Sequence, residues 1–166
     1  MSGSWRHIAT GLEEDIRRQV SAVLERGDGI VTGGALGVDY LVTELVRQFD
    51  PELKQLKIFL PTDLDTYLAH FRQRVTEKVI TARQAKKLDQ QLRNVQKTRP
   101  RALFEGPPGL TVNEAAYYAR NRQVVNAADE LLAFQVNASP GTQHTIDYAH
   151  RLSKNVAVFK YKTTKA

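Results

Sequence analysis

The sequence predicts an α/β fold in three layers, with a doubly wound, mainly parallel sheet between two layers of helices. Two observations predict it. Short apolar runs alternate with segments whose apolar residues recur every three or four positions, as in strands joined by crossover helices. A glycine-rich turn also joins an apolar run to the helix that follows it. With 166 residues and 42% hydrophobic content, the chain suits one domain over residues 1–166.

The first half of the chain contains two helix-and-strand pairs. We expect a helix over residues 12–26, a buried strand over 29–32, a helix from 38 that stops before Asp50-Pro51, and a strand over 57–61. Right-handed crossovers between them make the strands parallel. A sheet of this kind normally opens with a central strand, but only Met1 and Ser2 precede Gly3. We therefore expect the first strand to be truncated or missing.

The second half begins with a more charged region. Residues 62–110 are expected to form a helical insertion within the domain, because apolar residues recur at helical spacing in two pieces of it. The alternating pattern then resumes. We expect a helix around 115–128, a strand over 130–134, a turn at 137–142, a helix over 142–152 and a strand over 156–161.

Composition narrows the classes of protein. The formal charge of +6 fits a polyanionic partner, although many soluble proteins share it. With no Cys and four widely spaced His, the chain has no disulfide framework, and we expect neither a metal site nor a required cofactor. No run approaches the ~18 apolar residues of a membrane helix, so a cytoplasmic protein without a membrane partner is expected.

The strongest local motif is the turn VTGGALGVDYL over residues 31–41. Glycines let the backbone turn tightly, and the free N–H groups of the next helix favour an anion such as phosphate. The spacing G-G-x-x-G matches neither the dinucleotide fingerprint nor the P-loop. The alternative is that the glycines only close a turn. The candidate ligand-binding residues of this turn are Gly33, Gly34, Ala35, Gly37 and Asp39.

Three further segments carry polar residues suited to phosphate. The first is the small-residue loop with Gly3, Ser4 and Arg6, and the second is the R-N-R run Arg120, Asn121 and Arg122. The third is a predicted turn before a helix, with Ser139, Gly141, Thr142 and Thr145. Taken singly, they also fit a terminal tag, a solvated polar face and an ordinary capped helix.

Together the four segments resemble the SLOG superfamily of Rossmann-like nucleotide-binding domains. That superfamily includes the DNA-processing protein A (Smf) family, the YspA/YpsA-related proteins and the Lonely Guy cytokinin-activating hydrolases. Its G-S-R loop is similar to Gly3, Ser4 and Arg6, although Trp5 intervenes. Its G-G-A-x-G-x-D turn, R-N-R run and G-T/S-x-x-T-I turn are similar to residues 33–39, 120–122 and 141–146. The resemblance implies a Rossmann-like fold and a pocket for a nucleotide.

One departure from the resemblance bears on activity. The Lonely Guy hydrolases carry P-G-G-x-G-T-x-x-E, and the Glu after the Gly-Thr pair is absent here. The leading hypothesis is therefore a binding or sensing module for a nucleotide or nucleotide derivative, with no catalytic residues assigned. Single-stranded DNA binding of the DNA-processing type is the alternative. An N-glycosidic hydrolase using Asp39 or Asp147 ranks last. Relatives commonly dimerise, which implies a homo-oligomer.

A basic stripe is the last candidate feature. Residues 82–101 hold seven Lys and Arg but one acid, Asp89. Five of the basic residues recur on the helix face opposite its apolar side: Arg83, Lys86, Lys87, Arg93 and Lys97. Such a stripe can contact nucleic-acid phosphates without reading sequence. Charged helix faces are more often simply solvated, and that is the alternative.

Overall fold

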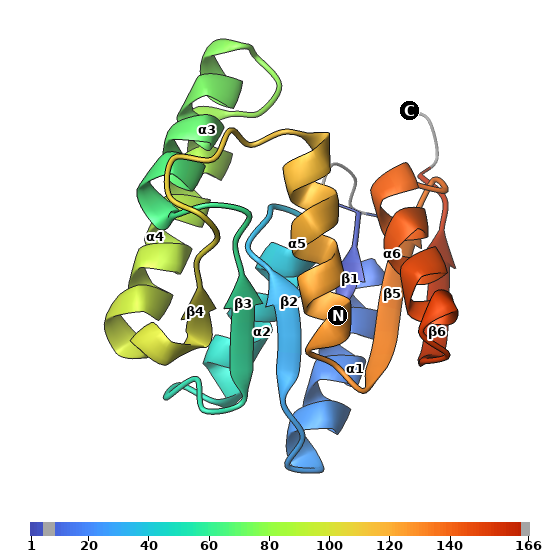
Figure 1. Cartoon of the computed structure of the whole chain (residues 1–166). Helices are drawn as coiled ribbons and strands as arrows, with labels where there is room; N and C mark the ends of the chain where they lie inside the picture. The colour runs from blue at the N-terminus through green and yellow to red at the C-terminus, as the bar shows by residue number, and fades with distance from the viewer. Residues whose placement is uncertain (5–8, 164–166) are drawn as a thin grey trace.

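The computed structural model describes residues 1–4 and 9–163. Within them, strands and helices alternate along the chain, except that two helices and a short 3-10 helix (Pro100–Ala102) lie between the third and fourth strands (Figure 1). The strands are β1 (Ser2–Gly3), β2 (Ile30–Gly33), β3 (Leu56–Phe59), β4 (Leu103–Phe104), β5 (Glu130–Val136) and β6 (Asn155–Tyr161). The helices are α1 (Leu12–Glu25), α2 (Val38–Phe49), α3 (Leu64–Thr76), α4 (Ala82–Thr98), α5 (Glu114–Asn126) and α6 (Pro140–Arg151).

The strands form two parallel three-stranded sheets, ordered β2-β3-β4 and β1-β5-β6. The short β1 lies where the two meet. It pairs with β5 in the register Ser2 to Ala133 and Gly3 to Phe134, while the Met1 ammonium donates to the Val31 carbonyl of β2. The expected first strand is thus present as a two-residue strand at the centre of the fold.

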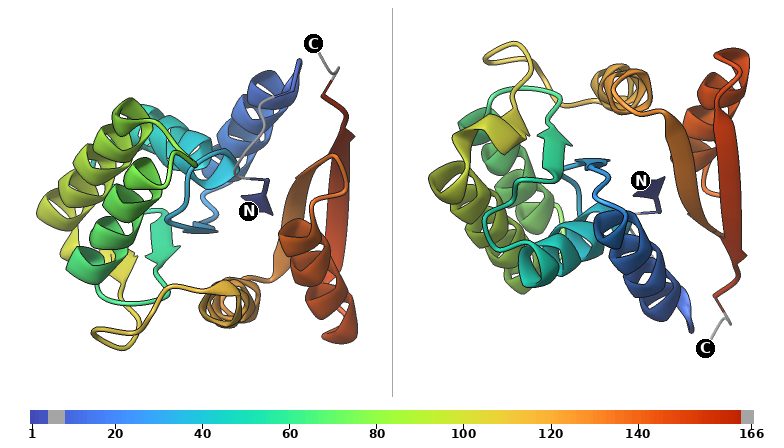
Figure 2. Two further views of the ribbon diagram at one scale, coloured as in Figure 1. Left: turned by 90° about the horizontal axis from the view of Figure 1, so that it is seen from above. Right: turned by 90° about the horizontal axis from the view of Figure 1, so that it is seen from below.

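Helices cover both faces of the strands, which makes a three-layer Rossmann-like fold (Figure 2). Helices α1 and α2 pack together on one face, and α5 and α6 pack together on the other. The α1 face that turns inward carries Leu12, Ile16, Val20 and Val23, which are all buried, as its helical spacing predicts. No helix within residues 1–4 and 9–163 has the length and apolarity needed to cross a membrane.

The region predicted as a helical insertion, 62–110, contains most of the connection between β3 and β4 and also β4 itself. It holds α3, which Asp63 caps, and α4, which begins with a capping box formed by Thr81 and Gln84. Gln91 of α4 donates to the Tyr40 carbonyl at 3.0 Å and to Glu44 Oε1 at 2.7 Å. Since both partners belong to α2, α4 packs against α2.

The structure differs from the sequence-based expectation at β4, at the start of α6, and by one or two residues at the ends of several other elements. Strand β4 was not expected, because its two residues are too few to show a period. Helix α6 begins at Pro140 rather than at 142, because proline at the first helical position needs no N–H partner. The first difference is a whole short strand and the second is the start of a helix, and the order of the other strands and helices agrees with the prediction.

Candidate functional site

Buried side chains pack closely against the glycine-rich turn after β2. A Cβ on Gly33 would lie 1.7 Å from Nη1 of Arg120 and 2.5 Å from Oδ2 of Asp39. A Cβ on Gly34 would lie 2.4 Å from Cδ2 of Leu60. Both positions therefore require glycine because buried side chains press against the turn. Gly37 adopts φ 74° and ψ −126°, a conformation open to glycine and strained for other residues.

A buried ion pair supports this turn. Arg120 Nη1 lies 3.5 Å from Asp39 Oδ2, and the two side chains are 5% and 8% exposed. Asp39 also accepts hydrogen bonds from Thr32 Oγ1 at 3.1 Å and from the Ala35 N–H at 3.4 Å. Burial raises the pKa of the Asp39 carboxyl, and the attraction of Arg120 offsets that only in part. Arg120 and Asp39 thus hold the turn in shape from beneath.

A chain of hydroxyl groups joins the end of β1 to the start of α6. Ser4 Oγ accepts from the Val136 N–H at 2.9 Å and donates to Ser139 Oγ at 3.0 Å. Ser139 Oγ in turn donates to Thr142 Oγ1 at 2.6 Å. Ser4 and Thr142 are buried, whereas Ser139 is partly exposed. We call the hydroxyl-bearing Ser4, Ser139 and Thr142, together with the backbone of Gly141 between them, the hydroxyl cluster.

The first turn of α6 keeps its N–H groups free of a side-chain cap. Ser139 occupies the cap position, but its hydroxyl makes no capping hydrogen bond and contacts Thr142 instead. The N–H groups of Gly141 and Thr142 lie in the first turn, where no helix carbonyl can reach them. Nothing lies within 4 Å of a Cβ placed on Gly141. This turn therefore offers free donors beside open space.

The backbone before α6 is also unusual. Asn137 and Ala138 both have φ of 51°, the left-handed region that costs roughly 1 kcal/mol for a residue such as Ala. Asn137 is fixed there by hydrogen bonds with Thr163, through Nδ2 at 2.6 Å and Oδ1 at 3.0 Å. The strained turn directs Ser139 toward Ser4. The sequence did not reveal it, since neither residue is glycine.

The two turns meet at Ser4. The Ser4 carbonyl accepts from the Val38 N–H of α2 at 3.1 Å, and the Ser4 hydroxyl belongs to the α6 cluster. A Cβ on Gly3 would lie 2.5 Å from Val38 and 2.6 Å from the Phe134 carbonyl, so only glycine lets the strands and α2 approach this closely. The carboxyl ends of β1, β2 and β5 therefore form one edge, where open α/β sheets bind ligands.

The other predicted residues are placed differently. Arg6 lies outside the described residues. Asn121 Oδ1 accepts from Nε of Arg120 at 2.9 Å, and Arg122 is exposed on α5. Thr145 is buried and donates to the Gly141 carbonyl at 3.0 Å, so it supports the helix backbone. Among the described residues, no group of three or more His, Asp or Glu is arranged to hold a metal ion.

The basic stripe lies far from the hydroxyl cluster. Its five residues are exposed on α4, at the end of the fold opposite α6 (Figures 1 and 2). Arg93 is not free, because Asp65 and Asp89 contact it at 2.8 and 3.0 Å. These carboxylates raise the pKa of Arg93, and the hydrogen bond that Arg93 donates to Asp65 contributes most. The stripe thus offers fewer free charges than its sequence indicates.

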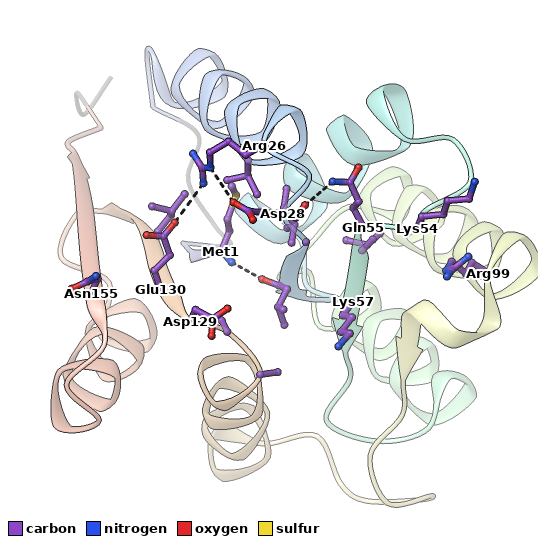
Figure 3. Close-up of a pocket in the computed structure, with 18 of the residues that line it drawn as sticks. Met1, Arg26, Asp28, Lys54, Gln55, Lys57, Arg99, Asp129, Glu130 and Asn155 are labelled. Carbon is purple, nitrogen blue, oxygen red and sulfur yellow. Dashed lines mark hydrogen bonds and ion pairs between the residues drawn. The ribbon is translucent and has the colours of Figure 1, made fainter.

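One cavity lies at the amino edge of the strands, at the opposite end from both turns. It measures about 880 Å³ and lies between the amino ends of β2 and β5, where Met1 lines it (Figure 3). A smaller one of about 420 Å³ lies between α3 and α4. Neither is lined by a residue of the hydroxyl cluster. The candidate site is therefore defined by its donors and its open edge.

Comparison with known proteins identifies the fold. No protein-family model matches the chain, and no curated protein matches it in sequence. The solved structures to which it is similar include the following two. One is DNA processing protein A from Helicobacter pylori, described for its single-stranded DNA binding mode, with a TM-score of 0.66 and 18% identity. The other is DNA processing protein A from Streptococcus pneumoniae, with a TM-score of 0.58 and 16% identity.

The match covers nearly all of this chain but only part of each neighbour. It spans 95% of the chain in both cases, against 63% of the Helicobacter protein and 48% of the Streptococcus protein. The chain has the Rossmann-like fold found in DNA processing protein A.

Proposed function

We propose that this chain binds single-stranded DNA and holds a backbone phosphate at the hydroxyl cluster. The observation that carries the proposal is the uncapped first turn of α6. There no side chain caps the N–H groups of Gly141 and Thr142, and a Cβ on Gly141 would meet open space. The Ser139 hydroxyl lies beside them and would turn its proton from Thr142 Oγ1 to a bound phosphate. Backbone N–H groups at a helix N-terminus and hydroxyl groups are the donors that commonly bind phosphate.

The exposure of the members of the hydroxyl cluster supports this role. Ser139 and Gly141 are partly exposed and would contact the phosphate, while the buried Ser4 and Thr142 position the Ser139 hydroxyl. A ligand held only by such neutral donors gains affinity from general charge attraction, which the formal charge of +6 supplies. The similarity to a protein described as binding single-stranded DNA supports the same choice of ligand.

The test introduces a negative charge at Gly141, where a side chain would meet nothing within 4 Å. Gly141→Asp places a carboxylate at a helix N-terminus, where the helix tolerates it, but it repels a phosphate. Fluorescence anisotropy with a labelled oligo-dT should show at least a tenfold loss of affinity, about 1.4 kcal/mol. Ser153→Asp is the matched control, because it makes the same charge change just beyond the other end of α6. Equal losses in both variants would refute the assignment of the site.

A mononucleotide or nucleotide derivative is the second candidate ligand. The cluster is a single group of donors around Gly141, so one terminal phosphate could satisfy it. Competition separates the candidates: dTMP and ADP-ribose are titrated against bound oligo-dT. If either competes at micromolar concentration while longer oligonucleotides bind no more tightly, the nucleotide is the ligand. An affinity that rises with strand length favours DNA.

The basic stripe gives a separate prediction for the same assay. If α4 contacts DNA, Lys86→Glu with Lys87→Glu should weaken binding and flatten its dependence on salt, because two phosphate contacts are lost. Both side chains are exposed, so folding should be unaffected. An unchanged salt slope would show that the stripe is only a solvated helix face.

A further inference from the structure

One face of the sheet formed by β2, β3 and β4 is only partly covered. Gly33, Phe59 and Phe104 are partners across these three strands, so all three point to the same face. Arg120 of α5 lies against Gly33, which identifies this face as the one that α5 covers. Helix α5 packs against β2 and β3, but within the described residues no helix lies in front of β4 (Figure 1). Phe104 is consequently 39% exposed.

Phe104 presents one side of its ring to solvent. The ring stacks on that of Phe59, with the centroids 4.7 Å apart and the planes at 17°. Phe59 thus covers one side of the Phe104 ring and fixes its orientation, so the exposed area belongs to the other side. A fixed aromatic ring with a free side is a surface on which a nucleobase can stack.

The connection from β4 to α5 is tied to the start of α3 and leaves this ring open. Gly109 donates its N–H to Asp63 Oδ2 at 2.7 Å. Glu105, the acid next to Phe104 in sequence, accepts from the Leu64 N–H at 3.0 Å. Its carboxylate is therefore held at the start of α3, where it does not repel a phosphate beside the exposed ring.

Basic side chains flank the aromatic pair. Lys57 precedes Phe59 by two residues on β3, about 7 Å along the strand, and points to the same face (Figure 3). It lines the amino-edge cavity together with Arg99 and Arg101, from the segment before β4, and both Lys57 and Arg101 are exposed. The cavity lining also holds three acids, of which two pair with Arg26 and the third follows α5: Asp28, Glu130 and Asp129.

We propose that this face is a second contact for single-stranded nucleic acid, in which a base stacks on Phe104 while Lys57 and Arg101 contact backbone phosphates. The inference rests on the proposed function and adds a further site for the same ligand. The strand order β4-β3-β2 places the face across the Gly33 turn from the hydroxyl cluster, so the two sites hold different nucleotides of one strand. A second copy of this chain fits the face less well, because the cores of protein interfaces are depleted of lysine.

The test compares two strands with the same phosphates, oligo-dT and an abasic strand of equal length. In fluorescence anisotropy the full chain should bind oligo-dT at least roughly fivefold more tightly, the effect of one stacked base. Phe104→Leu keeps the apolar volume but removes the ring, so it should lower this preference about fivefold. Phe104→Trp should retain the preference. Phe49→Leu is the matched control, because Phe49 is a 47% exposed phenylalanine at the end of α2.

A second variant tests the phosphate contacts without touching the aromatic pair. Lys57→Glu with Arg101→Glu should weaken binding of both strands and flatten its dependence on salt, because two phosphate contacts are lost. Both side chains are exposed, so the variant should fold even if Phe104→Leu does not. An unchanged salt slope would contradict these contacts.

Two further results would overturn the proposal. One is an equal preference for oligo-dT in Phe104→Leu and Phe49→Leu. The other is a dimer that Phe104→Leu converts to a monomer at unchanged DNA affinity, which would make the face an interface between copies.

Failure of this proposal is distinguishable from failure of the proposed function. Gly141→Asp should weaken binding of both strands alike, because the hydroxyl cluster contacts phosphate, whereas Phe104→Leu should affect oligo-dT alone. Equal losses in Gly141→Asp and Ser153→Asp refute only the phosphate site, and a chain that binds neither strand refutes both proposals.

Discussion

The two glycine-containing turns at the carboxyl edge look alike in sequence and differ in structure. The turn into α2 is pressed from beneath by Arg120, Asp39 and Leu60, so Gly33 and Gly34 leave no room for a side chain. The turn into α6 has open space at Gly141 and an uncapped first turn. A glycine-rich turn can thus serve packing in one place and leave room for a ligand in another.

The largest effect should come from breaking the ion pair under the first turn. Arg120→Met leaves the buried Asp39 carboxylate without its cation, which typically costs about 3–5 kcal/mol. Urea unfolding would measure the loss. Adding Asp39→Leu removes the stranded charge and should recover part of the stability. If the Arg120→Met variant were as stable as the unsubstituted protein, the ion pair of Arg120 and Asp39 would not stabilise the turn.

The next effect compares the two glycines directly. Gly33→Ala forces a Cβ against the Arg120 guanidinium and should destabilise the fold by about 1–3 kcal/mol. Gly141→Ala meets nothing within 4 Å and lies in a helix, so stability should stay within about 1 kcal/mol or improve. Thermal unfolding of both proteins checks the contrast. Similar losses of stability in the two variants would show that the two turns do not differ in how tightly they are packed.

The smallest effect concerns a single hydroxyl. Ser139→Ala removes the exposed member of the hydroxyl cluster and should weaken oligo-dT binding by about 0.5–1.5 kcal/mol. Its effect on folding should be similarly small, because Ser139 is partly exposed and does not cap α6. Anisotropy and urea unfolding on the same sample separate the two effects. Unaltered DNA affinity would remove Ser139 from the site.

Local pattern was enough to predict most of the fold. The alternation of apolar runs and helical periods gave the order of the longer elements, because each period is set by neighbouring residues. The exception is β4, whose two residues carry no period. That the protein is cytoplasmic and forms a homo-oligomer stays a prediction.

The site was harder to predict because its contacts join distant parts of the chain. Ser4 meets Ser139 across 135 positions, and their sequence motifs were found while the hydrogen bond between them was not. From the sequence, Arg120 was predicted to bind phosphate beside Arg122. Its burial against Asp39 could not be predicted, because it depends on how α5 packs on β2. The left-handed Ala138 gave no signal, since alanine rarely adopts that conformation.

The most direct test of the phosphate site is an NMR titration of the labelled protein with oligo-dT. We expect the amide signals of Gly141 and Thr142 to shift most and in proportion to bound DNA, with smaller shifts at Gly33 and Gly34. Shifts confined to α4, with the signals of residues 139–142 unmoved, would contradict it.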